Sequence, residues 1–187
     1  MAYNLFPEST EEPVILDSPP PGELLVAELH RLGVHFLRTA PLLAAPAPLP
    51  PANLLASLAA SPEARLRLAI IPLLLWRPEY AEVALSAARC LPSHPRLTLQ
   101  CYYTAAVLLQ RQHARRLQTL GASSLPLPDL FSHQLGLPLV ASPKQRLAAL
   151  AARQSQLSNE SLNWLGTYQH AAETFLRHLE LQAAWKT

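Results

Sequence analysis

Histidine is the residue type of this chain that could most readily bind a metal or act as a general base. The sequence contains seven histidines among 187 residues. A di-iron centre in a helical bundle uses Glu-x-x-His motifs on paired helices, and the sequence contains no Glu-x-x-His and no His-x-x-x-His. The reversed spacing, His170-x-x-Glu173, occurs once. The pattern predicts no metal and no other cofactor, with the histidines scattered over the surface or partly buried.

Local motifs for nucleophilic catalysis and for phosphate binding are also missing. The sequence contains no Gly-x-Ser-x-Gly, and no two glycines stand close enough to form a phosphate-binding loop. Neither Cys90 nor Cys101 lies in a context that activates a thiol, and we expect both to be buried as small apolar residues. We therefore predict a protein without catalytic activity, while an enzyme whose site is assembled from residues distant in sequence stays an alternative.

Arginine is the residue type that could contact phosphate, because its rigid guanidinium matches phosphate oxygens. The sequence holds thirteen arginines and two lysines. Five of the arginines are candidate phosphate contacts: Arg65, Arg67, Arg111, Arg115 and Arg116. The last three end a predicted helix, where cations complement the helix dipole and stay solvated. We favour that simpler explanation and keep phosphate binding as an alternative.

A regular apolar stripe near the carboxyl end is the clearest candidate for helix packing. Its members step by three and four residues, which is the spacing of knobs-into-holes packing: Leu165, Tyr168, Ala172, Phe175 and Leu179. Glu173 and Arg177 have the i,i+4 spacing of an ion pair on another face. We expect the stripe to face a helix, either of this chain or of a partner.

Prolines and serines mark the helices that must position these residues. The chain has nineteen prolines and five glycines, and Ser61-Pro62 and Ser142-Pro143 each predict a helix start, with serine as the cap and proline in the first turn. Gln145, three residues after Ser142, completes a capping box. Leucine and alanine runs separate the prolines. The sequence predicts an all-α fold, an antiparallel bundle of roughly six to eight proline-delimited helices.

The longest helices are predicted in the second half of the chain. One is expected from Pro95 to Leu120, ended by Gly121 and apolar almost all round in its first half. The last is expected from Asn159 to about Trp185. Pro72 must kink or end the apolar helix that contains it, because proline cannot donate the i→i−4 hydrogen bond.

Charge is distributed unevenly and suggests an acidic tail before a basic body. Residues 1–30 carry six acids and no Lys or Arg, whereas residues 31–153 carry thirteen Lys or Arg against four acids. We expect an acidic, proline-rich tail over 1–22 that docks on the body or on a partner, and one helical domain over 23–187 with a Pro/Ala connector at 41–51. The tail offers two apolar clusters for docking: Leu5, Phe6, Val14, Ile15 and Leu16.

Cysteine usage and hydropathy bear on location. The chain has two cysteines without CxxC spacing and an acidic amino terminus where a secretory leader would be basic. The longest purely apolar run, Leu68–Trp76, falls far short of the ~20 residues that span a bilayer. We therefore predict a cytoplasmic protein with reduced thiols and no membrane contact.

The low charge content fits two explanations equally well: association with another chain, or alanine and proline that raise the hydrophobic content without forming an apolar patch. Charged residues make up 15% of the chain, against about 25% in typical globular domains. We predict a non-catalytic, helical protein–protein interaction subunit or adaptor of a cytoplasmic complex, with an antitoxin-like role as one form. Its partner would be another protein or a second copy. The alternative is a nucleic-acid-binding protein whose basic helical surface is masked by the acidic tail.

Overall fold

The computed structural model describes residues 20–35, 37, 47–138 and 140–185. In chain order the helices are α1 (Gly22–Arg31), α2 (Pro51–Ala60), α3 (Ala64–Leu68), α4 (Ile70–Trp76), the 3-10 helix η1 (Pro78–Val83), α5 (Ala84–Cys90), α6 (Ser93–Gln112), α7 (Ala114–Thr119), α8 (Pro143–Ser158) and α9 (Trp164–Ala184). No strand occurs among the described residues. The predicted all-α class is therefore confirmed.

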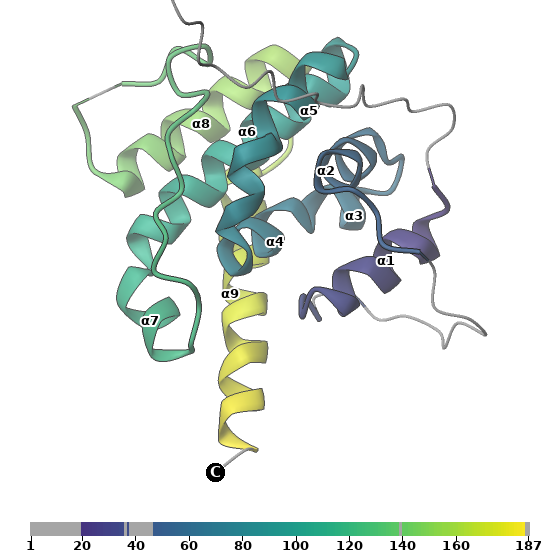
Figure 1. Cartoon of the computed structure of the whole chain (residues 1–187). Coiled ribbons are helices and arrows are strands. Elements are labelled where there is room, and N and C mark those ends of the chain that lie inside the picture. The colour runs from purple at the N-terminus through teal and green to yellow at the C-terminus, as the bar shows by residue number, and fades with distance from the viewer. Residues whose placement is uncertain (1–19, 36, 38–46, 139, 186–187) are drawn as a thin grey trace, which may run out of the picture.

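Helix α6 is the centre of the bundle. It packs mainly against α8 and α4, and also contacts α2 and α9 (Figure 1). Its apolar residues from Leu99 to Leu109 are buried on every face, as the sequence predicts for a central helix. The Tyr103 hydroxyl donates to the Pro128 carbonyl oxygen at 2.9 Å, which ties the loop before α8 to this helix.

Local capping chemistry works as expected at α8 and differs at α3. The Ser142 hydroxyl accepts from the Gln145 amide at 3.3 Å, and the Gln145 side chain accepts from the Ser142 amide at 3.0 Å, so the capping box is present. At the other Ser-Pro pair the prediction is wrong by two residues. Ser61 accepts from the Glu63 amide at 3.2 Å, and α3 begins only at Ala64.

The helix predicted from Pro95 to Leu120 is broken at His113. No proline or glycine lies between Pro95 and Gly121, so the local sequence does not mark the break. α7 turns so that Leu117 is buried, while the neighbouring Arg116 reaches α9. Tertiary contacts thus override the helical propensity of the segment. Gly121 does end α7, with φ +82° and the paired hydrogen bonds of a Schellman motif.

The last helix also begins later than the sequence predicts. Asn159 has φ 55°, which ends α8 in the left-handed conformation instead of opening α9. Asn163 caps α9 by accepting from the Gly166 amide at 3.0 Å. Pro72 lies inside α4, and the break falls before it at Ala69, where the Leu68 carbonyl has no amide partner at position 72.

Several sequence predictions lie outside the described residues. The candidate docking residues of the tail (Leu5, Phe6, Val14, Ile15 and Leu16) are among them, as is most of the 41–51 connector. The two cysteines differ from one another: Cys101 is buried, which raises the pKa of its thiol to about 12, but Cys90 is exposed, so its predicted burial is wrong. Within the described ranges, no helix combines the length and the apolar character needed to cross a bilayer.

Candidate functional site

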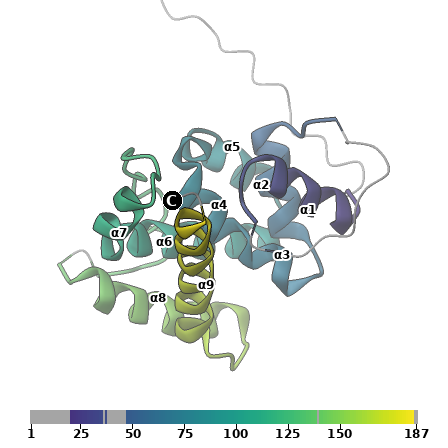
Figure 2. The same ribbon diagram turned by 90° about the horizontal axis from the view of Figure 1, so that it is seen from below.

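The five candidate arginines lie in two separate places. Arg65 and Arg67 belong to α3, which lies on the opposite side of the molecule from α7 in both views (Figures 1 and 2). Arg65 pairs with Glu63 at 2.6 Å, and Arg67 donates to the carbonyl oxygens of Ser61 and Pro62 at 2.8 Å each. These two arginines therefore serve the entry into α3. The structure does not join them to the others in one surface.

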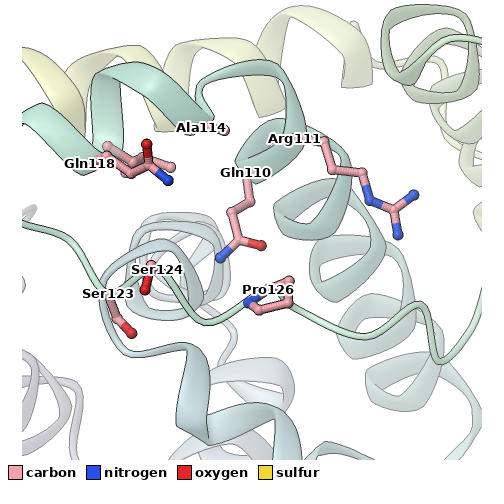
Figure 3. Close-up of a pocket in the computed structure, with 8 residues that line it drawn as sticks. Gln110, Arg111, Ala114, Gln118, Ser123, Ser124 and Pro126 are labelled. Carbon is pink, nitrogen blue, oxygen red and sulfur yellow. The ribbon is translucent and has the colours of Figure 1, made fainter.

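The remaining three arginines surround the break between α6 and α7. Two depressions of about 140 and 360 Å³ meet there and share Arg111 and Ala114. We call this area the α6–α7 surface, formed by residues 110–118, Ser123, Ser124 and Pro126. Figure 3 shows Gln110 pointing from α6 toward the loop with the two serines, whereas the guanidinium of Arg111 points away from them.

The loop beside this surface is held by Gln110. Its side-chain amide donates to the Leu125 carbonyl oxygen at 3.0 Å and accepts from the Leu127 amide at 2.8 Å. Ser123 accepts from the Leu125 amide at 3.2 Å. Two of the polar side chains that line the smaller depression, Gln110 and Ser123, are thus used to fix the loop.

Arg116 links α7 to α9. Its guanidinium contacts Glu180 through Nε at 2.6 Å and Glu173 through Nη1 at 2.6 Å, with further bonds of 3.0 Å to each carboxylate. These hydrogen bonds raise the pKa of Arg116 and lower the pKa of both carboxyl groups. Glu173 therefore pairs across helices with Arg116, which the i,i+4 spacing to Arg177 did not predict. The positive charge of Arg116 is thus compensated by two carboxylates.

His113 lies at the break itself and is partly buried. Burial lowers its pKa, the nearby Arg116 lowers it further, and Glu173 acts weakly in the opposite direction. The imidazole is thus favoured as the neutral form. Because Glu173 is bound to Arg116, it does not orient His113 in the manner of a catalytic pair.

Arg111 and Arg115 have no side-chain partner among the described residues. Neither side chain forms a hydrogen bond or an ion pair with any residue that the structure describes, and both are exposed. Among the described residues, no three His, Cys, Asp or Glu side chains are placed to hold a metal ion. This surface can therefore bind an anionic group through two free guanidinium ions.

The apolar stripe of α9 lies mostly inside this chain. Tyr168, Ala172, Phe175 and Leu179 are buried, and Leu165 is half-buried. The Tyr168 hydroxyl donates to Gln154 of α8, and the Tyr168 ring meets Tyr102 of α6 edge to face at 5.9 Å. These contacts are internal, so the buried part of the stripe offers no surface to a partner.

The end of α9 carries apolar side chains that nothing in the described chain covers. Leu181 is 55% exposed and Trp185 is 88% exposed. They stand four residues apart, on one face of the helix. Figure 1 shows this end extending beyond the other helices. In the sequence, apolar residues continue past Leu179. They can be distinguished from the buried stripe only when it is known where α9 stops packing against the other helices.

Three histidines meet between the end of α1 and α9. The His35 ring lies 4.9 Å from the His30 ring and 6.0 Å from the His178 ring, between centroids. The His30 imidazole contacts the Leu37 carbonyl oxygen at 2.5 Å. The Nε2 atom of His178 is buried and has no hydrogen-bond partner among the described residues. Burial lowers the pKa of His35, and the charges of the other two histidines lower it further.

Comparisons with models of protein families, with curated proteins and with solved structures find no match for this chain. The function proposed below therefore depends on the geometry of these surfaces.

Proposed function

We propose that this protein is a non-catalytic interaction subunit that binds another protein through the end of α9. The observation that carries the proposal is the exposure of Leu181 and Trp185, at 55% and 88%. Trp is among the side chains that contribute most to binding energy at interfaces, because it combines a large apolar area with few rotamers. A tryptophan held in water on a projecting helix end therefore favours a docking role.

The surroundings of these two residues support the same proposal. Arg116 bridges Glu173 and Glu180, so α7 braces α9 just before the exposed end. A braced helix presents its side chains with little loss of conformational freedom on binding. Arg177 and Glu180 supply charges beside the apolar residues, which is the arrangement of an apolar centre with a polar rim.

The test is co-purification of the full chain from the cells that express it. The paired variant Leu181→Ser/Trp185→Ser is compared with Leu157→Ser/Leu162→Ser, whose leucines are 44% and 58% exposed but lie at the junction of α8 and α9. We expect the wild type and the junction variant to retain a stoichiometric partner that the α9 variant loses. A partner retained by the α9 variant, or a wild type without one, would remove the basis of the proposal.

Nucleic-acid binding is a second candidate, favoured by Arg111 and Arg115, which have no acidic partner in the described part of the chain. Phosphate contacts make affinity fall steeply with salt. We expect a labelled oligonucleotide to bind at low salt and Arg111→Gln/Arg115→Gln to weaken it. An oligonucleotide that does not bind at any salt concentration, or binds both proteins equally, would dispose of this candidate. The partner and the cytoplasmic location stay predictions.

A further inference from the structure

The α6–α7 surface lies in a part of the chain that is almost without acids. Residues 84–159 contain eight Lys or Arg and one acid, Asp129. That acid is bound to the buried Arg146 at 2.8 Å. The nearest carboxylates on α9, Glu173 and Glu180, are both bound to Arg116. Arg111 and Arg115 therefore lack a negative partner within the described residues.

The shape and chemistry of this surface suit a short acidic and apolar segment. Arg111 and Arg115 both line the larger depression, of about 360 Å³. The buried Leu117 lines the adjoining depression, and Leu125, in the neighbouring loop, is 49% exposed. An occupant would pair carboxylates with the guanidinium groups and cover the exposed side chain of Leu125.

One segment of the chain itself has this composition. Residues 8–17 (ESTEEPVILD) contain four acids, no Lys or Arg, and three adjacent aliphatic residues. Charge and apolar content are therefore complementary to the α6–α7 surface. We propose that residues 8–17 of one copy bind the α6–α7 surface of a second copy.

The length of chain between this segment and the folded body favours a second copy over the same one. Glu12 and Glu8 lie eight and twelve residues before Pro20, and fully extended these spans cover at most about 29 and 43 Å. α1, which follows Pro20, and α7 lie on opposite sides of the molecule in both views (Figures 1 and 2). A compact domain of this size is about 40 Å across, so a path over its surface to the far side is about 60 Å. This path is longer than either span, so the segment reaches the α6–α7 surface of a second copy more readily than that of its own chain.

The resulting contact is head-to-tail and is held largely by charge. A heterologous contact of this kind either closes into a ring or continues as an open chain of copies. Salt weakens it, because the guanidinium groups are exposed. The end of α9 takes no part, so this contact and the proposed function can succeed or fail separately.

Two full-length variants test the contact by complementation. One carries Arg111→Gln and Arg115→Gln, which removes the receiving charges. The other carries Glu8→Gln, Glu11→Gln, Glu12→Gln and Asp17→Asn, which removes the donated charges. Sedimentation velocity at low salt should show association of the wild type and monomers of each variant alone. An equimolar mixture of the two variants retains one intact contact and should form 1:1 dimers.

Matched controls separate this contact from general charge effects. Arg89→Gln/Lys144→Gln removes two other exposed positive charges and should associate like the wild type, as should Leu181→Ser/Trp185→Ser. Raising the salt from about 50 to 300 mM should weaken the association at least tenfold.

The proposal would be overturned by a wild type that is monomeric at low salt, or by association that survives Arg111→Gln/Arg115→Gln. It would also be overturned by a mixture of the two variants that stays monomeric, or by an Arg89→Gln/Lys144→Gln control that loses association to the same extent. A monomeric wild type whose isolated 8–17 peptide still binds through Arg111 and Arg115 would place the contact within one chain. An oligonucleotide whose binding depends on Arg111 and Arg115, and which binds the wild type and the tail variant equally without dissociating the wild-type assembly, would show that no contact covers this surface.

Discussion

At the scale of single residues, Phe175 shows how α9 is fixed to the body. Its side chain is fully buried, and its ring meets the Trp76 ring edge to face at 6.2 Å. Phe175→Ala should lower the free energy of unfolding by ~3–5 kcal/mol, because a buried aromatic leaves a cavity that the core cannot fill.

The matched control on the same helix is Arg177→Ala, whose side chain is exposed. It should cost at most ~0.5 kcal/mol, since exposed charges contribute little. Thermal melts of the two variants compare the faces directly. Equal melting temperatures would mean that the buried face of α9 is assigned wrongly.

Asp129 and Arg146 form the one ion pair among the described residues in which the cation is buried. The Arg146 side chain is 7% exposed and that of Asp129 is 24% exposed. Asp129→Asn leaves a buried guanidinium without a counter-charge and should cost about 2 kcal/mol or more. Arg146→Leu leaves a carboxylate that water can reach, and it should cost less. Urea unfolding midpoints give the order, and a greater loss for Arg146→Leu would contradict it.

At the scale of elements, the start of α8 depends on its capping box. Ser142→Ala removes the acceptor of the Gln145 amide and should cost about 1 kcal/mol. Ser155→Ala in the same helix removes only a bond to the Ala151 carbonyl oxygen and should be nearly neutral. Chemical denaturation of both variants measures the difference, and equal effects would show that the cap contributes nothing.

The same elements show which features the sequence could predict. The capping box was predictable because Ser142 and Gln145 are three residues apart, so all of its geometry is local. The break at His113 was not, because its causes are the burial of Leu117 and the pairing of Arg116 with residues about sixty positions away. The local signal there, a run without proline or glycine, favours a continuous helix.

The candidate sites, too, were predictable only where their features depend on residues close in sequence. The stripe through Tyr168 and Phe175 was recognisable from its spacing, which does not depend on the partner helix. Separating Arg115 from Arg116 required the positions of Glu173 and Glu180, because adjacent arginines look alike in a sequence. The same holds for Trp185, whose exposure depends on where the bundle ends.

At the scale of the whole molecule, the histidines couple stability to pH. The pKa values of His35 and His113 are lowered in the folded state from about 6.5. Around that pH the two imidazoles bind protons more readily in the unfolded chain than in the folded chain. The free energy of unfolding should therefore fall as the pH is lowered from about 7.5 to 5.5. His35→Asn should flatten this dependence in thermal melts.

His133→Asn serves as the control for this dependence, because His133 is exposed and lies outside the cluster of His30, His35 and His178. It should keep the slope of the wild type. If His35→Asn leaves the slope unchanged, or His133→Asn flattens it as much, the cluster is not the source of the pH dependence.

The central claim is that this protein acts by docking another protein at the end of α9. The most direct measurement is photo-crosslinking in living cells, with a photoreactive amino acid placed at the exposed Ala184, beside Trp185, or at Val140, which is 98% exposed. We predict that position 184 yields one discrete heavier adduct and that position 140 does not. Absence of an adduct at 184, or the same adducts from both positions, would contradict the claim.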